Sequence, residues 1–171
     1  AASDRASSVI DRSRALFRSR PIQHEPVSVE GLIENSVGIL QRQLLDAQIV
    51  VTTRCTPPTL LVLGDAVHLQ QVLDNLISNA VDALQDASTE RQLKIEACRS
   101  GRRTVRLTVQ DTGPGIDAAD IDQIFDPFFS SRPEGLGLGL AIARSIVSAH
   151  RGRIGASRAA GCGTRIDIEL P

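Results

Sequence analysis

Three amide side chains, Gln71, Asn75 and Asn79, stand at steps of four in a strongly helical stretch of the sequence. That spacing places them on one stripe of an α-helix, beside the apolar arc that would face a core. Amide oxygens can ligate a hard cation such as Mg²⁺ without adding charge, which suits a site that already holds phosphate charges. Taken alone, the stripe would be better explained as solvent-facing amides, so its meaning depends on its neighbours.

A carboxylate followed by glycines forms the second group. Asp111 comes at the end of an expected strand, and Gly113 and Gly115 follow it. The glycines would let the backbone pass close to a ligand. A carboxylate only accepts hydrogen bonds, so it would pair with the exocyclic amino group of adenine and repel the carbonyl of guanine. Aspartic proteases also use an Asp-Thr-Gly triplet, but they need two, and this chain has one triplet and no duplicate.

The third group is a run of glycines that alternate with leucines. Gly135, Gly137 and Gly139 lead directly into a helical pattern at residues 140–149. Backbone N–H groups at a helix N-terminus face outward and bind phosphate oxygens, and glycine leaves them accessible. A Gly-Leu alternation alone would be weak support for a phosphate site.

A lid is expected between the two glycine-rich segments. Residues 116–134 read as a loop that is too long to be idle in a compact domain. Phe125, Phe128 and Phe129 could pin this loop to the body of the protein. Arg132 is the nearest cation to the expected phosphate end, although a general surface role would fit it almost as well.

The elements that must position these groups alternate between helical and β patterns. Helices are expected at residues 29–45, 69–84 and 140–149, and strands at residues 49–54, 59–63, 92–98, 104–110, 153–157 and 164–170. Asp65 is the expected N-cap of the central helix. The apolar residues of that helix that should be buried are Leu69, Val72, Leu73, Leu76, Ile77, Ala80 and Leu84. This order predicts an α+β fold in which helices cover one face of a mixed sheet.

The N-terminal residues form an amphipathic pattern of their own. Residues 4–18 carry an apolar helical stripe, and Pro21 ends the pattern. We expect residues 1–20 to be the tail of a longer helix, residues 21–27 a linker and residues 28–171 the folded domain. An ordinary N-terminal helix that packs on its own domain is the alternative.

Length and charge exclude several classes of function. A chain of 171 residues supports one hydrophobic core. The formal net charge is −1, so no broad cationic surface is expected for nucleic acid or for an acidic membrane. The three cysteines lack metal-ligand spacing, and no signal peptide or membrane span is recognisable, so we expect a cytoplasmic location for this part of the protein.

The ordered series of amide helix, Asp-x-Gly-x-Gly, Phe-rich lid and Gly-x-Gly-x-Gly resembles the ATP-binding domain of sensor histidine kinases. These domains have the Bergerat fold, a two-layer α/β sandwich shared with gyrase, Hsp90 and MutL. The resemblance covers nearly the whole chain and implies ATP and Mg²⁺ as cofactors. By this likeness Asn79 is the metal ligand, with Asn75 a phosphate or water contact and a second candidate metal ligand, and Asp111 contacts adenine. The other nucleotide-binding residues implied by the resemblance are Gly113, Gly115, Ile116, Phe125, Gly135, Leu136, Gly137, Leu138, Gly139 and Leu140.

The lid sequence looks most like that of kinases that sense nitrogen, oxygen or dicarboxylates. Two positions depart from common family patterns. Arg132 stands where many relatives have Lys, which keeps the charge, and the basic residue that some kinases carry just after the second Asn is absent, since Val81 and Asp82 stand there. The second departure puts more weight on Arg132 as the lid cation.

Asn75 favours a kinase over an ATPase. In the related clamp ATPases a Glu at this place activates water for hydrolysis, and an amide cannot act as that base. ATP would then be held without hydrolysis, so its γ-phosphoryl group would be kept for another acceptor. We expect Asn75 and Arg132 to serve the transfer step. An ATP-hydrolysing or purely nucleotide-regulated module of the same fold is the alternative.

The acceptor in this family is a histidine, and none of His24, His68 and His150 stands in a suitable position. We therefore expect the acceptor on a dimerisation and phosphotransfer domain of the same protein, with a response-regulator receiver domain as the later partner. The full-length protein is expected to be a homodimer, and the sequence leaves open whether its other parts anchor it to a membrane. No membrane contact and no nucleic acid are expected for this segment.

Overall fold

The computed structural model describes residues 24–85, 87, 90–130 and 136–171. The expected helix at residues 4–18 lies outside this part of the chain, as do Arg132 and Gly135. The predictions made for them are not tested.

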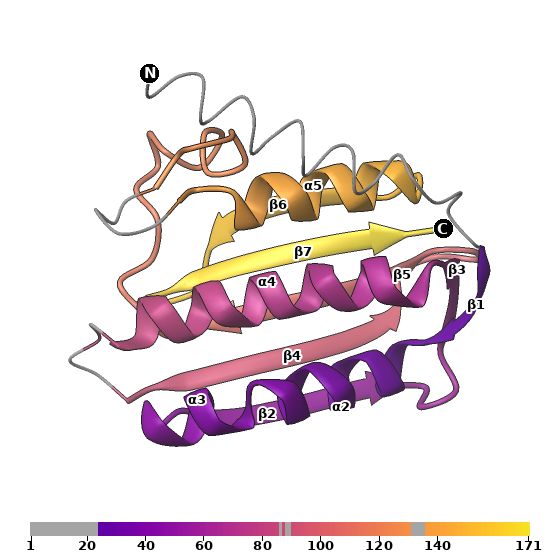
Figure 1. The fold of residues 1–171 in the computed structure, drawn as a ribbon, viewed down its shortest axis with the longest axis horizontal. Helices are drawn as coiled ribbons and strands as arrows, with labels where there is room; N and C mark the ends of the chain where they lie inside the picture. Colours follow the sequence, from indigo (N-terminus) through magenta and orange to yellow (C-terminus); the bar gives the residue numbers. More distant parts are fainter. Residues whose placement is uncertain (1–23, 86, 88–89, 131–135) are drawn as a thin grey trace.

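The domain has two layers, a mixed five-stranded sheet and a layer of helices on one of its faces (Figure 1). The strand order is β2-β4-β5-β7-β6, in which β2 and β4 run parallel and the other neighbours antiparallel. The elements are α2 (Val29–Ile39), α3 (Gln41–Asp46), β2 (Val50–Thr56), α4 (Ala66–Gln85), β4 (Gln92–Arg99), β5 (Val105–Asp111), α5 (Gly139–Ala149), β6 (Arg153–Arg158) and β7 (Thr164–Leu170). The predicted α+β class, with a two-layer sandwich of the Bergerat type, is confirmed.

Helix α4 lies between α2 and α5 in the helical layer and carries the centre of the core (Figure 1). All seven apolar residues expected to be buried on it are buried, and Val81 joins them. Asp65 caps its N-terminus, since Oδ1 accepts the N–H groups of Val67 at 3.0 Å and His68 at 3.2 Å. The helix that bears the amide stripe is therefore fixed on the sheet along most of its length.

A second sheet of two short strands was not predicted. β1 (Glu25–Ser28) pairs antiparallel with β3 (Leu61–Gly64). β1 covers residues that the sequence analysis divided between the linker and the domain. Its four residues include Pro26, and only Val27 is buried, so no alternating pattern marks it.

The first helical pattern is interrupted at Leu40, where α2 ends and α3 begins. Gly38 lies in the last turn of α2, and glycine weakens a helix by about 1 kcal/mol relative to alanine. The prediction of one continuous helix at residues 29–45 was wrong. The apolar pattern continues from α2 into α3, so it gave no sign of the break between them.

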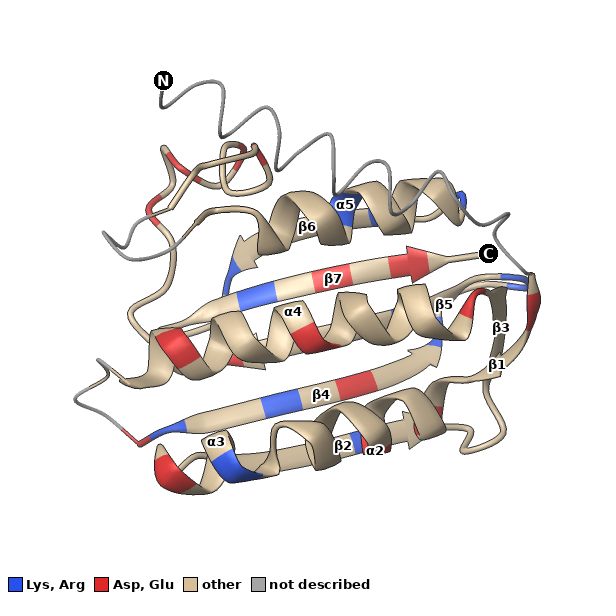
Figure 2. Ribbon diagram, in the orientation of Figure 1, with Lys and Arg blue, Asp and Glu red and all other residues tan. Residues whose placement is uncertain are grey.

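In β4 and β7 buried residues alternate with more exposed ones, and several of the exposed residues are charged and paired with opposite charges. Figure 2 shows the positive and negative residues along these two strands. Arg106 Nη2 lies 2.7 Å from Glu169 Oε1, and Arg165 Nε lies 2.8 Å from Asp167 Oδ2. Such exposed pairs contribute little stability. Because buried and charged residues alternate along these strands, one face of the sheet packs in the core and the other can face water.

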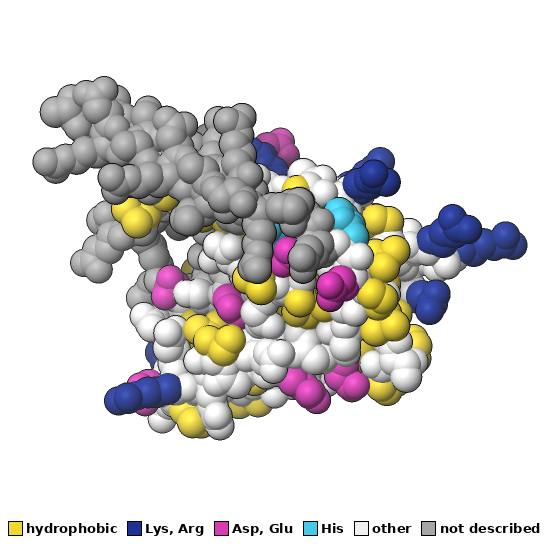
Figure 3. Space-filling model, turned by 45° about the vertical axis from the view of Figure 1, so that its right-hand side comes forward, with side chains coloured by type: hydrophobic (Ala, Val, Ile, Leu, Met, Phe, Trp, Pro, Cys, Tyr) yellow, Lys and Arg dark blue, Asp and Glu magenta, His cyan; other side chains and the backbone are white. Residues whose placement is uncertain are grey.

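His150 joins three elements at the end of α5. Its Nδ1–H donates to the Ile146 carbonyl at 2.8 Å, and its Nε2 accepts the Asp65 N–H at 3.0 Å. The rings of His24 and His68 lie 5.8 and 6.3 Å from its ring, so the three histidines of the chain meet here. On the face shown in Figure 3, histidine atoms reach the surface in one small area. His150 itself is 2% exposed.

The free energy of unfolding should fall with acidification through His150. Burial lowers its pKa, and His24 and His68 add to this effect against the opposing hydrogen bond to Ile146 and the charge of Asp65. The unfolded chain therefore takes up a proton more readily, so stability is full above the ordinary histidine pKa of about 6.5 and declines as the pH falls through it. Urea unfolding of the wild type and of His150→Gln between about pH 8 and pH 5.5 measures this. An equally steep decline in the variant would rule out His150 as the cause.

Candidate nucleotide-binding site

A cavity of about 680 Å³ opens between α4, the start of α5, the ends of β5 and β7 and the described part of the lid. Pockets of this size hold ligands of the size of a nucleotide. Its polar wall comes from α4, through Asn75, Asn79 and Asp82, and its apolar floor comes mainly from the sheet and the lid. Elements that are far apart in the sequence therefore supply one site.

The two asparagines meet the N-terminus of α5. Asn75 Nδ2 donates to the Gly139 carbonyl at 3.2 Å. A Cβ atom placed on Gly139 would lie 3.6 Å from Asn79 Nδ2 and 3.9 Å from Asn75 Cβ. Because α4 and α5 pack side by side, residues one helical turn apart on α4 face the first residue of α5. The asparagines proposed to hold the metal are thus in contact with Gly139, which belongs to the proposed phosphate-binding loop.

The N-terminus of α5, where the sequence predicts the phosphate site, is open to a ligand on its side-chain side. No side chain of the described residues caps it, so the N–H groups of its first turn lack side-chain acceptors. Gly137 has φ of +63°, and a Cβ there would lie 2.5 Å from the Phe129 carbonyl oxygen. The Phe128 N–H donates to the Gly137 carbonyl at 3.0 Å, so backbone contacts join the lid to this loop.

Asp111 is held at the end of β5 by backbone donors. Its Oδ1 accepts the N–H groups of Gly113 at 2.8 Å and Thr164 at 3.1 Å, and the residue is 5% exposed. Burial raises the pKa of this carboxyl, while the hydrogen bonds from Gly113 and Thr164 act against that rise. At Gly163, with φ of +105°, any Cβ would collide with the Asp111 backbone. The β6–β7 turn thus packs directly on the candidate adenine contact.

The residues fit a magnesium nucleotide. Among the described residues there is no cluster of three or more His, Cys, Asp or Glu side chains that could hold a metal alone. A cation at Asn79 would therefore complete its shell with phosphate oxygens and water, as Mg²⁺ usually does. The uncapped N–H groups of α5 would hold the same phosphates.

Most of the expected site residues line the cavity. They are Asn75, Asn79, Asp111, Gly115, Ile116, Leu136, Gly137, Leu138, Gly139 and Leu140. Gly113 acts through its hydrogen bond to Asp111. Phe125, which was expected to contact the nucleotide, does not line the cavity. It is buried in the core with 6% exposure, and the Arg144 guanidinium lies 5.9 Å from its ring. Phe129 lines the cavity instead.

Several lining residues were not anticipated. They include Asp82, Ala83, Ile124, Ser130, Thr164 and Ile166. Thr164 follows Gly161 and Gly163, so this further glycine-rich turn was the available signal. From the sequence, this turn was predicted only as part of a hairpin. Asp82 was noted only for replacing a basic residue.

The comparisons with known proteins agree with this geometry. Residues 64–171 match the family of histidine kinase-, DNA gyrase B- and HSP90-like ATPases. The match covers more than half of the chain, so the chain belongs to this family. It is a catalytic ATP-binding domain of the sensor histidine kinase type, as its relatives among curated proteins and solved structures indicate.

Several solved structures cover most of the chain, and two of them are isolated kinase structures of similar extent. A mycobacterial sensor histidine kinase, MprB, is 30% identical, covers 86% of this chain and 97% of its own, and has a TM-score of 0.77. The catalytic domain of histidine kinase ThkA is 28% identical, covers 86% of this chain and 95% of its own, and has a TM-score of 0.78.

The curated relatives are longer proteins. Sensor histidine kinase TmoS of Ectopseudomonas mendocina is 31% identical over 99% of this chain and 18% of its own length. Sensor histidine kinase ZraS of Klebsiella oxytoca is 32% identical over 98% of this chain and 36% of its own. The chain thus spans well under half of these relatives. In the part that the structure describes, no helix has the length and apolar character needed to cross a membrane.

Proposed function

We propose that this domain binds ATP with Mg²⁺ and donates the γ-phosphoryl group to a histidine on a separate domain. One observation carries the proposal: the cavity wall bears the amide of Asn75 where hydrolysis would need a base, and none of the three histidines lines the cavity. Because an amide cannot take a proton from water at that position, bound ATP is preserved for another nucleophile.

The histidines are too far from the site to receive the phosphoryl group. His68 precedes Asn79 by eleven residues on α4, and His150 follows Gly139 by eleven at the end of α5. At 1.5 Å per residue, each lies about 16 Å along a helix from the phosphate end. The ring of His24 lies 5.8 Å from that of His150, so His24 is also far from the proposed phosphate site. The acceptor must therefore come from elsewhere.

The residues of the cavity divide the work of holding the nucleotide. Asp111 would accept the adenine amino group, the N–H groups of α5 would bind phosphate oxygens, and Asn79 would bind the metal, with Asn75 beside it. The metal, when bound, neutralises phosphate charge and orients the γ-phosphoryl group. Arg132 and Gly135 are proposed to complete the phosphate end from the lid and the loop.

The partners proposed are the dimerisation and phosphotransfer domain of the same protein and a response-regulator receiver domain. Residues 1–20 would belong to the former and residues 21–27 to the linker, and the full-length protein would be a homodimer. The solved complex of histidine kinase ThkA with response regulator protein TrrA, at 24% identity, supports the likeness of fold alone. A cytoplasmic location suits the use of ATP and the free cysteines of the chain.

We also propose that the chain belongs near the kinases that sense nitrogen, oxygen or dicarboxylates, as the lid sequence suggests. Two relatives, DctB of Rhizobium meliloti and DctS of Rhodobacter capsulatus, are C4-dicarboxylate transport sensor proteins, each 32% identical to this chain.

Phosphoryl transfer can be tested by mixing the chain with γ-labelled ATP, Mg²⁺ and separately prepared acceptor domains from ZraS and DctB. We expect acid-labile label on the acceptor histidine, no label on this chain and little free phosphate. The same mixture with Asn79→Ala is the control and should give no transfer. Free phosphate that forms without acceptor and disappears in Asn75→Ala would instead indicate an ATPase. Bound ATP without transfer to any acceptor would favour a regulatory module.

A further inference from the structure

Asp82 adds a carboxylate to the polar wall of the cavity. It follows Asn79 by three residues on α4, so Asn75, Asn79 and Asp82 share one face of the helix. All three line the cavity. At 1.5 Å per residue, Asp82 lies about 4.5 Å beyond Asn79 along the helix axis.

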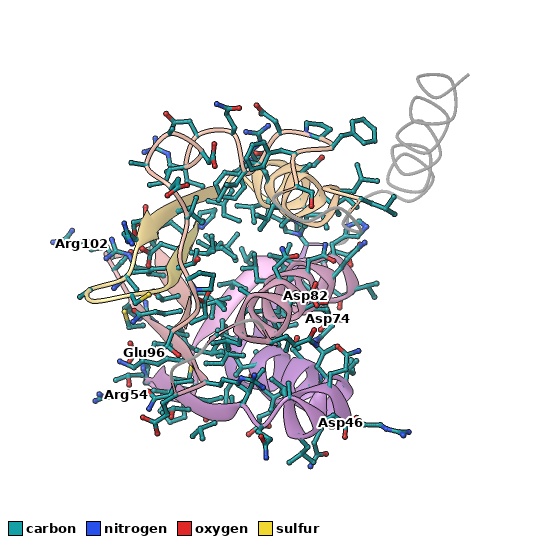
Figure 4. All side chains as sticks on the ribbon, turned by 90° about the vertical axis from the view of Figure 1, so that its left-hand side faces the viewer. Asp46, Arg54, Asp74, Asp82, Glu96 and Arg102 are labelled. Carbon is teal, nitrogen blue, oxygen red and sulfur yellow. The ribbon has the colours of Figure 1, made fainter. Side chains whose placement is uncertain are left out.

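This placement is not shared by the other carboxylate of the helix. Asp74 faces α2, where its Oδ1 accepts hydrogen bonds from Ser36 Oγ at 2.7 Å and from Gln70 Nε2 at 3.1 Å. Figure 4 labels both residues on α4, with Asp82 nearer to the α5 side. Asp74 serves helix packing, whereas Asp82 faces the space that a ligand would fill.

Asp82 is also distinct from Asp111, the other carboxylate among the described residues that line the cavity. Asp111 is buried and held by the backbone N–H groups of Gly113 and Thr164. Asp82 is solvent-exposed and stands on the wall shared with the amides. Asp82 thus shares its wall with Asn79, the expected metal ligand, whereas Asp111 lies at the expected place of the base.

A carboxylate beside a triphosphate has opposite effects with and without a cation. Without a cation, the like charges repel and disfavour binding. With Mg²⁺ between them the same carboxylate becomes favourable, since Mg²⁺ binds through one or two carboxylates, substrate phosphates and water. A basic residue at this position would do the reverse and would favour the nucleotide with or without metal.

We propose that Asp82 is a specificity-determining residue that makes the site select metal-bound over metal-free nucleotide. The proposal rests on the nucleotide-binding function proposed above. It goes beyond that function because it assigns to the carboxylate next to Asn79 the role of rejecting nucleotide that carries no divalent cation.

The test compares affinities for a non-hydrolysable ATP analogue in excess Mg²⁺ and in EDTA, at one ionic strength, by calorimetry. Asp82→Asn keeps the shape and removes the charge. We expect its metal-free affinity to rise roughly 5-fold, the size of one charge–charge interaction at an exposed site, with a smaller gain on adding Mg²⁺. Asp82→Glu should retain the wild-type gain.

Glu34→Gln is the matched control, since Glu34 is exposed on α2, does not line the cavity, and loses the same charge. It should leave both affinities unchanged. An equal gain from Mg²⁺ in Asp82→Asn and the wild type would overturn the proposal, and so would an identical shift in Glu34→Gln. Failure of the wild type to bind the analogue under either condition would instead overturn the nucleotide-binding function itself.

Discussion

Asn79→Ala is expected to remove the gain in ATP affinity that Mg²⁺ provides and to weaken Mg²⁺-ATP binding at least about 10-fold, since even outer-shell changes at metal sites cost that much. The amide of Asn79 stands at the cavity wall, against the first residue of α5. Alanine keeps the helix, because it is the best helix former, and removes the oxygen that would ligate the cation. Calorimetry with and without Mg²⁺ measures both effects.

Gln71→Ala is the matched control for Asn79. Gln71 lies two turns earlier on the same helix and is also an amide, but it does not line the cavity. Its replacement should leave both affinities close to those of the wild type. An Asn79→Ala variant that kept the full response to Mg²⁺ would show that the metal is held elsewhere.

Asp111→Asn is expected to lower ATP affinity at least about 10-fold, the cost of losing a hydrogen bond to a charged group, and to erase the preference for ATP over GTP. The Oδ1 of the native residue already accepts the Gly113 and Thr164 N–H groups. An asparagine oxygen can keep that place, which would turn its NH₂ group toward the base. A donor there would oppose the amino group of adenine and suit the carbonyl of guanine.

Competition between ATP and GTP for a bound fluorescent nucleotide measures this change. GTP serves as an internal control, because a variant that merely failed to fold would lose both nucleotides alike. Unchanged ATP preference in a folded Asp111→Asn protein would remove Asp111 from base recognition.

The features that the sequence predicted well depend on residues close together in the chain, such as an apolar pattern with the helical repeat. The apolar arc of α4 follows the helical repeat, so its buried residues were all identified in advance. The asparagines fall on the cavity wall because a step of four on a helix fixes a common direction. Asp65 could be predicted as an N-cap because its carboxylate accepts hydrogen bonds from backbone N–H groups only two and three residues further along the chain.

The features that were missed depend on contacts between distant segments. β1 is a strand only because β3 offers it a partner. Thr164 reaches Asp111 because β7 lies beside β5, which no local pattern of the β6–β7 hairpin reveals. The order of the phenylalanines in the lid gave no means to distinguish buried Phe125 from Phe129, which lines the cavity.

The meeting of the three histidines also lay beyond sequence reasoning. His24, His68 and His150 come together because the ends of β3 and α5 and the start of α4 converge. That convergence keeps all three away from the proposed phosphate end, in agreement with the proposal of an acceptor on another domain.

The most direct test of the central claim is a crystal structure of this domain with a non-hydrolysable ATP analogue and Mg²⁺. We expect the adenine amino group within hydrogen-bond distance of Asp111, the metal on Asn79 and the phosphates along Gly137 and Gly139 at the start of α5. A nucleotide bound outside this cavity, or one bound here with its base away from Asp111 and its phosphates away from α5, would contradict the account.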